Sequence, residues 1–260
     1  MPEKLPISVF IIAKNEADRI EKPILSVKDW VDEIIVIDSG SKDDTVAVSA
    51  KLGAKVLFNE WNGYGAQKIF GENQCRNNWL LNLDADEEIS QPLAENIKKL
   101  FSDNGPENNA YRIKWKILFP LEKKPPMFAP GGEFIRLYRK DKAGFRDSTV
   151  HDSVVIREGS VGKLNGLVLH RCFRSLPHWV EKLNFYSSMQ AQDFLAKGRK
   201  PSSFRIIFEP FFAFLKAYFL RRYFLYGIDG FVGSFLYAYG RLMRLAKARE
   251  LFKERAEKRL

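Results

Sequence analysis

Residues 79–90, WLLNLDADEEIS, run from an apolar segment straight into a cluster of acidic side chains. Asp84 and Asp86 stand two positions apart, so on an extended backbone both carboxylates point to the same side. When ionised, such a pair repels itself and raises a pKa, and a divalent cation removes this cost. The stretch therefore predicts a buried strand that ends at a cation site. A solvated acidic turn before a helix is the plainer alternative.

The first hundred residues alternate between two periodicities. Four short apolar segments rich in β-branched residues are expected to form strands, and the amphipathic segments between them to form helices. The strands are 7–13, 33–38, 54–58 and 79–84, and the helices are 17–29, 43–53 and 64–76. Short strands separated by such helices indicate βαβ units and a parallel sheet with both faces covered. The predicted fold class is α/β with a Rossmann-like sheet.

Polar side chains follow three of these predicted strands. Asn15 and Glu16 come after the first strand, Asp38 ends the second, and Asp84 ends the fourth. Ligands of open parallel sheets bind in the crevice beyond the carboxyl ends of the strands. We therefore expect these residues to share one ligand-binding rim, where Asp38 accepts from a ribose hydroxyl or a base edge. The alternative for Asp38 is that it only closes a capped loop.

After residue 90 the pattern changes. Ser90 is expected to cap a helix that runs to about residue 101. Further strands are expected at 110–119, at 133–139 and, after a turn, within 145–156. This half therefore resembles antiparallel or mixed strands built onto the parallel half.

The charge of the chain is unevenly distributed. Residues 197–260 carry 15 Lys and Arg against 5 Asp and Glu, so the whole net charge of +10 lies there and residues 1–196 are balanced. The same region is aromatic, because 14 of the 36 residues in 204–239 are Phe or Tyr. Charge asymmetry of this kind is typical of a region with an anionic partner, either a membrane or a nucleic acid.

The aromatic and basic end is expected to be helical. We predict helices over 205–222 and from 234 to the C-terminus, separated by the glycine-punctuated segment 226–233. Charged residues such as Glu209 and Lys216 exclude a simple membrane span. Aromatic side chains beside arginines suit a helix that lies in the plane of an anionic membrane surface. Packing against the catalytic domain or a homo-oligomer interface is the alternative.

Nothing near the start is typical of a targeting sequence. The apolar run 7–13 is followed at once by charge, and it is too short for a signal-peptide core or a membrane span. Cys75 and Cys172 form no spacing motif, which suits a reducing compartment. We therefore expect the protein in the cytoplasm.

Several segments together resemble glycosyltransferase family 2, and within it the bacterial lipopolysaccharide-core glucosyltransferases. They are ISVFIIAKNEADRI (7–20), VDEIIVIDSGSKDDT (31–45), NGYGAQKIFG (62–71) and WLLNLDADEEI (79–89), followed by RLYR (136–139), His151-Asp152 and YGIDGFVG (226–233). The resemblance implies a GT-A-type fold, a nucleotide-sugar donor, a divalent metal and inverting transfer. It also implies a catalytic domain over 1–196, with a nucleotide-sugar half (1–100) and an acceptor half (101–196), before a membrane-associating or oligomerising region (197–260).

Carried over position by position, the resemblance assigns residues to the donor and the metal. The nucleotide-sugar positions are Asn15, Glu16, Asp38, Lys68, Asp84 and Arg136. Asp84 and Asp86 match the D-x-D motif that binds Mg²⁺ or Mn²⁺, with Asp86 the expected direct ligand. His170 is a possible further metal ligand, with a satisfied strand histidine as the plainer reading. For Arg136, a surface arginine is the alternative.

Asp152 is the expected catalytic base. An acceptor hydroxyl is a poor nucleophile and needs a carboxylate within hydrogen-bond reach. Relatives often have His-Glu where this chain has His151-Asp152, so the shorter side chain reaches one methylene less far. A single base opposite a leaving nucleoside diphosphate, whose charge the metal neutralises, gives inversion. The alternative for Asp152 is a turn residue paired with Arg146 or Arg157.

The expected enzyme transfers glucose from UDP-glucose to a lipid-linked saccharide at the inner face of the cytoplasmic membrane. Three other functions fit less well. A sugar-1-phosphate nucleotidyltransferase needs a glycine-rich loop where this chain has AKNEADRI (13–20), and a D-x-D phosphatase needs Thr or Val where it has Glu88. A non-enzymatic nucleic-acid-binding protein is disfavoured because the acid-rimmed first 196 residues would repel a phosphate backbone.

Overall fold

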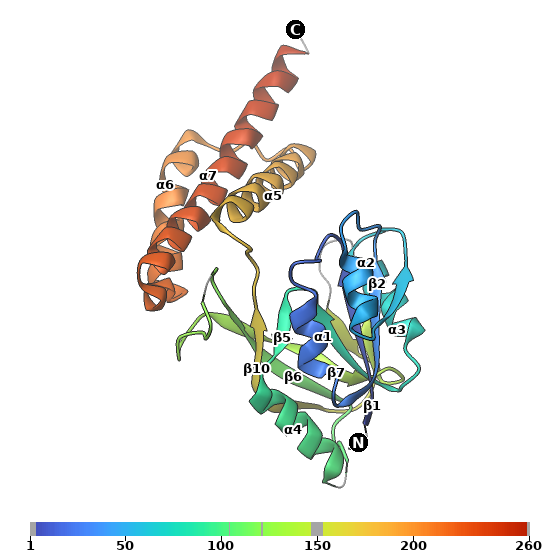
Figure 1. Ribbon diagram of the computed structural model, residues 1–260. Helices are drawn as coiled ribbons and strands as arrows, with labels where there is room; N and C mark the ends of the chain where they lie inside the picture. The colour runs from blue at the N-terminus through green and yellow to red at the C-terminus, as the bar shows by residue number, and fades with distance from the viewer. Residues whose placement is uncertain (1–3, 104, 121, 147–152, 259–260) are drawn as a thin grey trace. The chain divides into compact units, whose positions relative to one another are not determined.

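The computed structural model describes residues 4–103, 105–120, 122–146 and 153–258 (Figure 1). The chain forms two compact units that are each discontinuous in sequence. The sheet unit consists of Met1–Lys116 and Gly131–His170, and the helical unit consists of Ile117–Pro130 and Arg171–Leu260. The sheet unit therefore contains the predicted α/β region, and the helical unit contains the aromatic and basic end.

Within the described residues, the sheet unit is built on one eight-stranded sheet with the order β3-β2-β1-β4-β7-β6-β10-β5. The strands are β1 Leu5–Ala13, β2 Val31–Asp38, β3 Lys55–Phe58, β4 Trp79–Asp84, β5 Glu87–Ile89, β6 Ala110–Ile117, β7 Gly131–Arg139 and β10 Val161–His170. β1 to β4 pair in parallel, and β7 pairs antiparallel with both β4 and β6. Two short strands, β8 (Ala143–Phe145) and β9 (Val154–Ile156), form a separate antiparallel pair. The predicted mixed α/β architecture is confirmed.

Helices cover both faces of this sheet. They are α1 Glu21–Val27, α2 Thr45–Lys51, α3 Tyr64–Gln74 and α4 Gln91–Ser102. In β1, Val9 and Ile11 pack into the cluster that contains α1 and α4, whereas Phe10 and Ile12 pack into the cluster that contains α3. Because successive side chains are buried on opposite faces, the parallel strands are apolar almost throughout. This burial explains why their positions could be predicted closely.

Three strands, β5, β8 and β10, were not among the predicted ones. β5 lies inside the acidic stretch and pairs antiparallel with β10, with Ile89 opposite Val168 and Glu87 opposite His170. A three-residue strand carries too few residues to show a periodicity. Its partner lies about eighty residues further along the chain, so only the tertiary structure defines it.

The helical unit packs two helices against one long helix. Its elements are α5 Leu176–Ala196, α6 Ser203–Leu215, a π-helical turn Lys216–Leu220, a 3-10 turn Tyr223–Tyr226 and α7 Gly227–Glu257. Both α5 and α6 pack on α7 (Figure 1). Its core includes Phe119, Trp179 and Tyr226, and the Phe119 and Tyr226 rings stack with centroids 4.4 Å apart. None of the described helices is both long enough and apolar enough to cross a membrane.

Two boundaries in this region differ from the sequence-based expectation. The segment 226–233 was expected to separate two helices, but α7 already begins at Gly227, so this prediction was wrong. By its packing α5 belongs with α7, although the sequence placed it in the acceptor half. The division of labour between donor and acceptor halves stays a prediction.

Gly233 of α7 lies where the helix packs closely against aromatic side chains. A Cβ atom at this position would lie 2.9 Å from the Trp179 ring and 3.1 Å from the Phe119 ring, so the glycine supplies space for close packing. We expect Gly233→Ala to lower the free energy of unfolding by about 1–3 kcal/mol, the usual cost of overpacking a core. Urea unfolding of the two purified proteins measures this difference.

Gly240→Ala is the matched control on the same helix. Its added Cβ would meet only the flexible end of Leu183, at 2.9 Å from Cδ2. Alanine also favours a helix by about 1 kcal/mol over glycine. This variant is therefore expected to be neutral or stabilising, and equal losses in both variants would contradict the packing role of Gly233.

Candidate active site

The strand order places the predicted rim at a reversal in the path of the chain. From β1 the chain moves outward through β2 to β3, and it then adds β4 on the other side of β1. Loops diverge at such a switch point and leave a crevice beyond the carboxyl ends of the strands. Ala13 lies opposite Asp38, and Ile12 lies opposite Asp84. The structure therefore brings the polar residues that follow β1, β2 and β4 to one edge.

Asp84 is paired with two positively charged side chains at this edge. Its Oδ1 lies 2.9 Å from Lys68 Nζ, and its Oδ2 lies 3.4 Å from Arg136 Nη2. Burial acts to raise the pKa of Asp84, but the charges of Lys68 and Arg136 outweigh it and hold this pKa below its usual range. Because 31% of the Asp84 side chain is exposed, the ionised carboxylate can still accept a further partner.

Glu87 is a buried carboxylate to which the sequence analysis gave no role. It pairs with Arg136, and its Oε2 accepts a 3.0 Å hydrogen bond from the backbone nitrogen of Asp84. Arg136 also donates to Asn82 Oδ1 at 3.0 Å. Burial raises the pKa of Glu87, although the Arg136 charge opposes this effect. Arg136 is therefore a buried arginine held by the site, and the alternative of a surface arginine is wrong.

Asp86 contacts the predicted residue His170 directly and is linked to the predicted residue Glu16 through Arg19. Its Oδ1 lies 3.2 Å from His170 Nε2, and its Oδ2 lies 3.3 Å from Arg19 Nη1. Arg19 in turn pairs with Glu16 at 2.6 Å. Burial acts to raise the pKa of Asp86, but the hydrogen bond from His170 and the charges of His170 and Arg19 lower it below its usual value. The sequence analysis missed Arg19, although its three-residue spacing from Glu16 was a visible helical pairing signal.

The loops after β1 and β2 are joined by hydrogen bonds. Asn15, which has a positive φ of 56°, donates its backbone N–H to Ser41 Oγ at 2.9 Å and accepts from the backbone nitrogen of Lys42 at 2.8 Å. Asp38 accepts from the backbone nitrogens of Gly40 and Ser41, at 2.9 and 3.0 Å, and from the Ser41 hydroxyl. Asp38 thus closes its own loop, and its contact with a nucleotide stays a prediction.

A cavity of about 370 Å³ opens beside these charged groups. Its lining includes Lys68, Asp84, Glu87, Arg112, Trp115, Phe134, Arg136, Phe145, Ser153 and His170. The rings of Trp115 and Phe134 are stacked with centroids 5.9 Å apart, and the Trp115 ring also contacts His170 edge-on at 5.6 Å. The cavity therefore combines cationic side chains, two carboxylates and an aromatic wall. The sequence analysis gave no role to Trp115, whose alternating strand pattern only indicated a half-exposed strand.

The expected base, Asp152, lies outside the described residues, as does His151. Ser153 is the first described residue after it and lines the cavity. The catalytic role of Asp152 therefore stays a prediction.

Glu72 holds the backbone of Phe145, a residue that lines the cavity. Its Oε1 accepts from the Tyr138 hydroxyl at 2.6 Å and from the backbone nitrogen of Phe145 at 3.0 Å. The Phe145 ring lies 5.1 Å from Lys68 Nζ. Burial raises the pKa of Glu72 above its ordinary value, against the hydrogen bond from Tyr138. Glu72 and Lys68, one turn apart on α3, thus hold Phe145 and Asp84 in fixed positions.

A divalent cation fits the donor chemistry of this site when other ligands complete its shell. Among the described residues, no group of three or more His, Cys, Asp and Glu side chains is arranged to hold a metal alone. Asp86 and His170 lie in contact, and Asp84 is partly exposed, so oxygen and nitrogen donors of the kinds that Mn²⁺ accepts are present. Mg²⁺ usually takes one or two carboxylates together with water and substrate phosphates. The residues therefore suit a cation that is bound jointly with a phosphate-bearing ligand.

Comparison with known proteins decides the family. A sequence profile described as Glycosyl transferase family 2 matches residues 8–158, more than half of the chain. The chain belongs to glycosyltransferase family 2. This family 2 enzyme is 47% identical over 254 residues to an uncharacterized glycosyltransferase of Rickettsia prowazekii, covering 94% of the chain and 87% of the relative. The predicted activity, a glycosyltransferase with a GT-A-type fold, is confirmed.

Another relative of this family 2 enzyme has a more specific name. The lipopolysaccharide core biosynthesis glycosyltransferase LpsC of Rhizobium meliloti is 32% identical over 241 residues, covering 89% of the chain and 87% of the relative. Among solved structures, Staphylococcus aureus TarS (residues 1–349) aligns over 98% of the chain and 92% of its own, with 14% identity and a TM-score of 0.47. The resemblance to family 2 stated from the sequence is thus confirmed at the family level.

Proposed function

We propose that this glycosyltransferase moves a hexose, with glucose the expected sugar, from a UDP-sugar to a lipid-linked saccharide such as lipopolysaccharide core. The single observation that carries the proposal is the meeting of Asp84, Asp86, Lys68 and Arg136 at the switch point of the sheet. The likeness to LpsC, whose name refers to lipopolysaccharide core biosynthesis, supports the acceptor class. The donor sugar and nucleotide rest on the sequence resemblance.

In this proposal the rim residues bind the nucleoside end of the donor. The hydrogen-bonded loops hold Asn15 and Asp38 at the carboxyl ends of β1 and β2, where nucleotides bind in open sheets. Glu16 is fixed by its ion pair with Arg19, which also contacts Asp86. The nucleoside contacts and the diphosphate contacts are therefore connected through Arg19.

The acidic and basic residues at the end of β4 would act on the diphosphate. Asp84, Asp86 and His170 would hold Mg²⁺ or Mn²⁺, which when bound neutralises charge on the leaving diphosphate. Lys68 and Arg136 already lie within 3.4 Å of Asp84, so they place fixed positive charge where negative charge develops. Such preorganised charge favours the transition state over the ground state.

The acceptor would enter from the aromatic side of the cavity. Asp152 would take the proton of the attacking hydroxyl, and a single attack opposite the diphosphate inverts the anomeric configuration. The stacked Trp115 and Phe134 rings offer an apolar surface for one face of a sugar ring. The helical unit would attach the enzyme to the inner face of the cytoplasmic membrane, where a lipid-linked acceptor would be present.

Coupled binding of metal and nucleotide is the first test. Because no group of three or more His, Cys, Asp and Glu side chains among the described residues is arranged to hold a metal, oxygens of UDP and water would complete the ligand shell. We expect Mn²⁺ to tighten UDP binding by about tenfold or more, and UDP to tighten Mn²⁺ binding by the same factor, since coupling is reciprocal. Titration calorimetry with UDP in Mn²⁺ and in EDTA measures the first factor, and titration with Mn²⁺ in the presence and absence of UDP measures the second.

The outcomes separate the parts of the proposal. Binding of GDP, ADP or CMP in place of UDP would show that the assigned nucleotide is wrong. UDP binding that is unchanged by EDTA would contradict the metal site. A transfer assay with labelled UDP-glucose and a lipid-linked saccharide, followed by anomeric analysis of the product, then tests the sugar, the acceptor and inversion.

A further inference from the structure

A cluster of arginines surrounds a single carboxylate in the helical unit. Glu209 on α6 accepts a 2.6 Å hydrogen bond from Arg205 on the same helix and pairs with Arg244 on α7. Arg241 Nη1 lies 3.9 Å from the same carboxylate. Three guanidinium groups thus share one negative charge, which leaves an excess of positive charge at this point.

Arg244 shows that this excess is not relieved inside the protein. Its side chain is only 14% exposed, and in the part of the chain that the structure describes its buried Nε has no hydrogen-bond partner. A buried charged donor without a partner is costly. Burial, together with the charge of Arg241, lowers the pKa of the Arg244 guanidinium. An anion bound beside Arg244 would accept a hydrogen bond from its Nε and would offset the unfavourable burial of its charge.

Two cavities open beside the cluster, and both include Arg205 and Arg244 in their linings. One, of about 220 Å³, is also lined by Lys197 and Arg199 against Asp193. The other, of about 340 Å³, is lined by Lys216, Phe212 and Arg241 in addition to Glu209. In each cavity four cationic side chains face one carboxylate.

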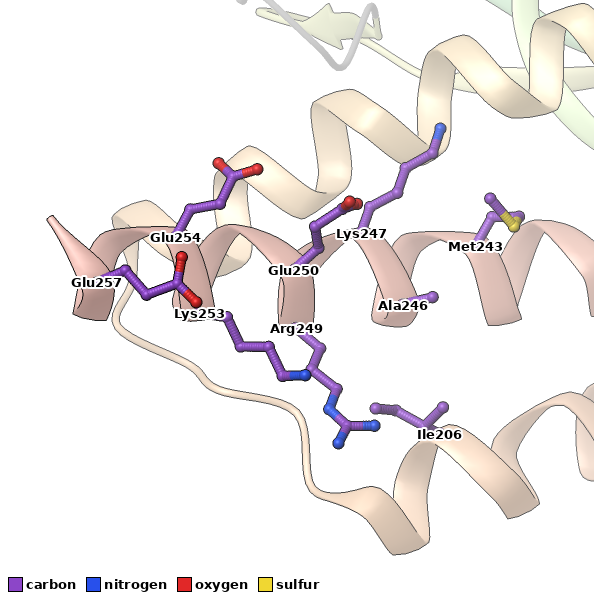
Figure 2. A pocket seen from close by; sticks show the side chains of 9 residues that line it. All are labelled: Ile206, Met243, Ala246, Lys247, Arg249, Glu250, Lys253, Glu254 and Glu257. Carbon is purple, nitrogen blue, oxygen red and sulfur yellow. The ribbon is translucent and has the colours of Figure 1, made fainter.

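A third cavity of the same unit provides a contrast. Figure 2 shows its lining, which comes from α7 and from Ile206 on α6. Its three cationic side chains, Lys247, Arg249 and Lys253, are matched by three acidic ones, Glu250, Glu254 and Glu257. A balanced lining does not attract an anion, so of these three cavities only the two beside Arg244 have an excess of positive charge.

Aromatic rings hold these guanidinium groups in place. The guanidinium groups of Arg205 and Arg244 lie 5.3 and 5.7 Å from the centroid of the Phe194 ring. Arg241 donates to the Tyr237 hydroxyl at 2.8 Å, with its guanidinium 5.3 Å from the Tyr237 ring. Stacked arginines lose less conformational freedom when they bind, and their planar forks match phosphate oxygens in pairs. The cluster is therefore organised for a phosphate group.

An exposed apolar surface lies on the same helix. Phe204, Ile207, Phe208 and Phe211 follow helical spacing along one face of α6 and are 69%, 67%, 42% and 60% exposed. Phe212, also 60% exposed, lines the larger cavity. A helix that joins an apolar face to an arginine-rich flank is typical of helices that lie at a lipid surface.

We propose that the cavities around Arg205, Arg241 and Arg244 bind the phosphate of an anionic lipid headgroup while the Phe204–Phe211 face of α6 enters the apolar layer beneath it. The inference rests on the membrane-associated part of the proposed function and not on sugar transfer. It gives the enzyme a phospholipid site in the helical unit, separate from the cavity at the end of β4.

Vesicle binding tests the site. Co-sedimentation of the full chain is measured with phosphatidylcholine vesicles that contain or lack phosphatidylglycerol. We expect R241Q/R244Q to weaken binding to the anionic vesicles by about tenfold or more, because each basic residue at the surface strengthens attachment. R249Q/K253Q removes two charges of the same helix from the balanced cavity, and it is expected to change binding by less than about twofold.

Further variants keep the test independent of folding. R205Q/K216Q changes exposed residues of the same cavities and is expected to weaken anionic binding in the same direction. Replacing Phe204, Phe208 and Phe211 with serine is expected to weaken binding to both kinds of vesicle. Sodium phosphate is expected to compete for the site more strongly than sodium chloride at equal ionic strength.

Each contrary outcome overturns a stated part of the proposal. Equal losses in R241Q/R244Q and R249Q/K253Q would show diffuse charge attraction instead of a site. Binding of inorganic phosphate without binding of vesicles would show a site for free phosphate and not for a lipid. A change of oligomeric state without a change in vesicle binding would show a subunit interface. UDP binding by R241Q/R244Q is measured in parallel. It shows whether the nucleotide site of the proposed function is affected independently of the lipid site.

Discussion

Asp86→Ala is expected to lower kcat/KM for sugar transfer on the order of 10³-fold and to abolish the Mn²⁺-dependent part of UDP binding. Asp86 lies between His170 and Arg19, at 3.2 and 3.3 Å, at the edge where Asp84 also ends its strand. In the proposed site, removing the Asp86 carboxylate would take away a metal oxygen ligand and would leave the positive charge of Arg19 to repel the metal. Calorimetry with UDP and Mn²⁺, together with a transfer assay, measures both effects.

Asp141→Ala is the matched control for this experiment. Asp141 is an exposed carboxylate paired with Arg139 at 2.8 Å, and it does not line the cavity. This variant is expected to keep both UDP binding and transfer within about twofold, as surface changes away from a site usually do. If Asp86→Ala still binds UDP in a Mn²⁺-dependent way, Asp86 is not a metal ligand and the D-x-D assignment is wrong.

Arg136→Met is expected to lower the free energy of unfolding by about 3–5 kcal/mol, because it leaves Glu87 buried without its ionic partner. The loss of stability is expected to depend on pH. Since the pKa of Glu87 is raised in the folded protein, the uncompensated acid is tolerated best when protonated, and stability falls as the pH rises through that raised pKa. Urea unfolding at pH 5 and at pH 8 measures both the loss and its sign.

Replacing both Arg136 and Glu87 distinguishes the effect of their ion pair from the effect of packing. The double variant Arg136→Met/Glu87→Met removes the unpaired charge and fills similar volume, so it is expected to recover most of the lost stability. It is not expected to recover sugar transfer, because one of the two positive charges beside Asp84, that of Arg136, is gone while Lys68 remains. A double variant as unstable as the single one would show that Arg136 acts through packing and not through Glu87.

The parallel half of the fold could be predicted from short windows of sequence. A strand buried on both faces must be apolar at almost every position, so β1, β2 and β4 show in the sequence as mostly apolar segments. The same argument placed Asp38 and Asp84 at strand ends, because a charge cannot continue a buried run. Their meeting at one edge then follows from the parallel direction of the strands.

The partners of the site residues could not be predicted in this way. Arg136 and Glu87 are 49 residues apart, and Arg19 and Asp86 are 67 residues apart. Both pairs depend on elements whose neighbours are set by the strand order, with β7 beside β4 and β5 beside β10. No local pattern distinguishes a buried, paired glutamate in DADEE from a solvated one.

In the helical unit, too, some features could be predicted from the sequence and others could not. Its composition alone indicated an aromatic, basic and helical region, because composition and charge can be counted without knowing the fold. The helical state of segment 226–233 and the convergence of three arginines on Glu209 depend on how α5, α6 and α7 pack. The sequence by itself therefore determined the parallel strands, the acidic ends of β2 and β4, the family and the charged end of the chain. Only the tertiary structure decided which charges are paired and which remain in excess, because contacts between distant residues are set by packing and not by local periodicity.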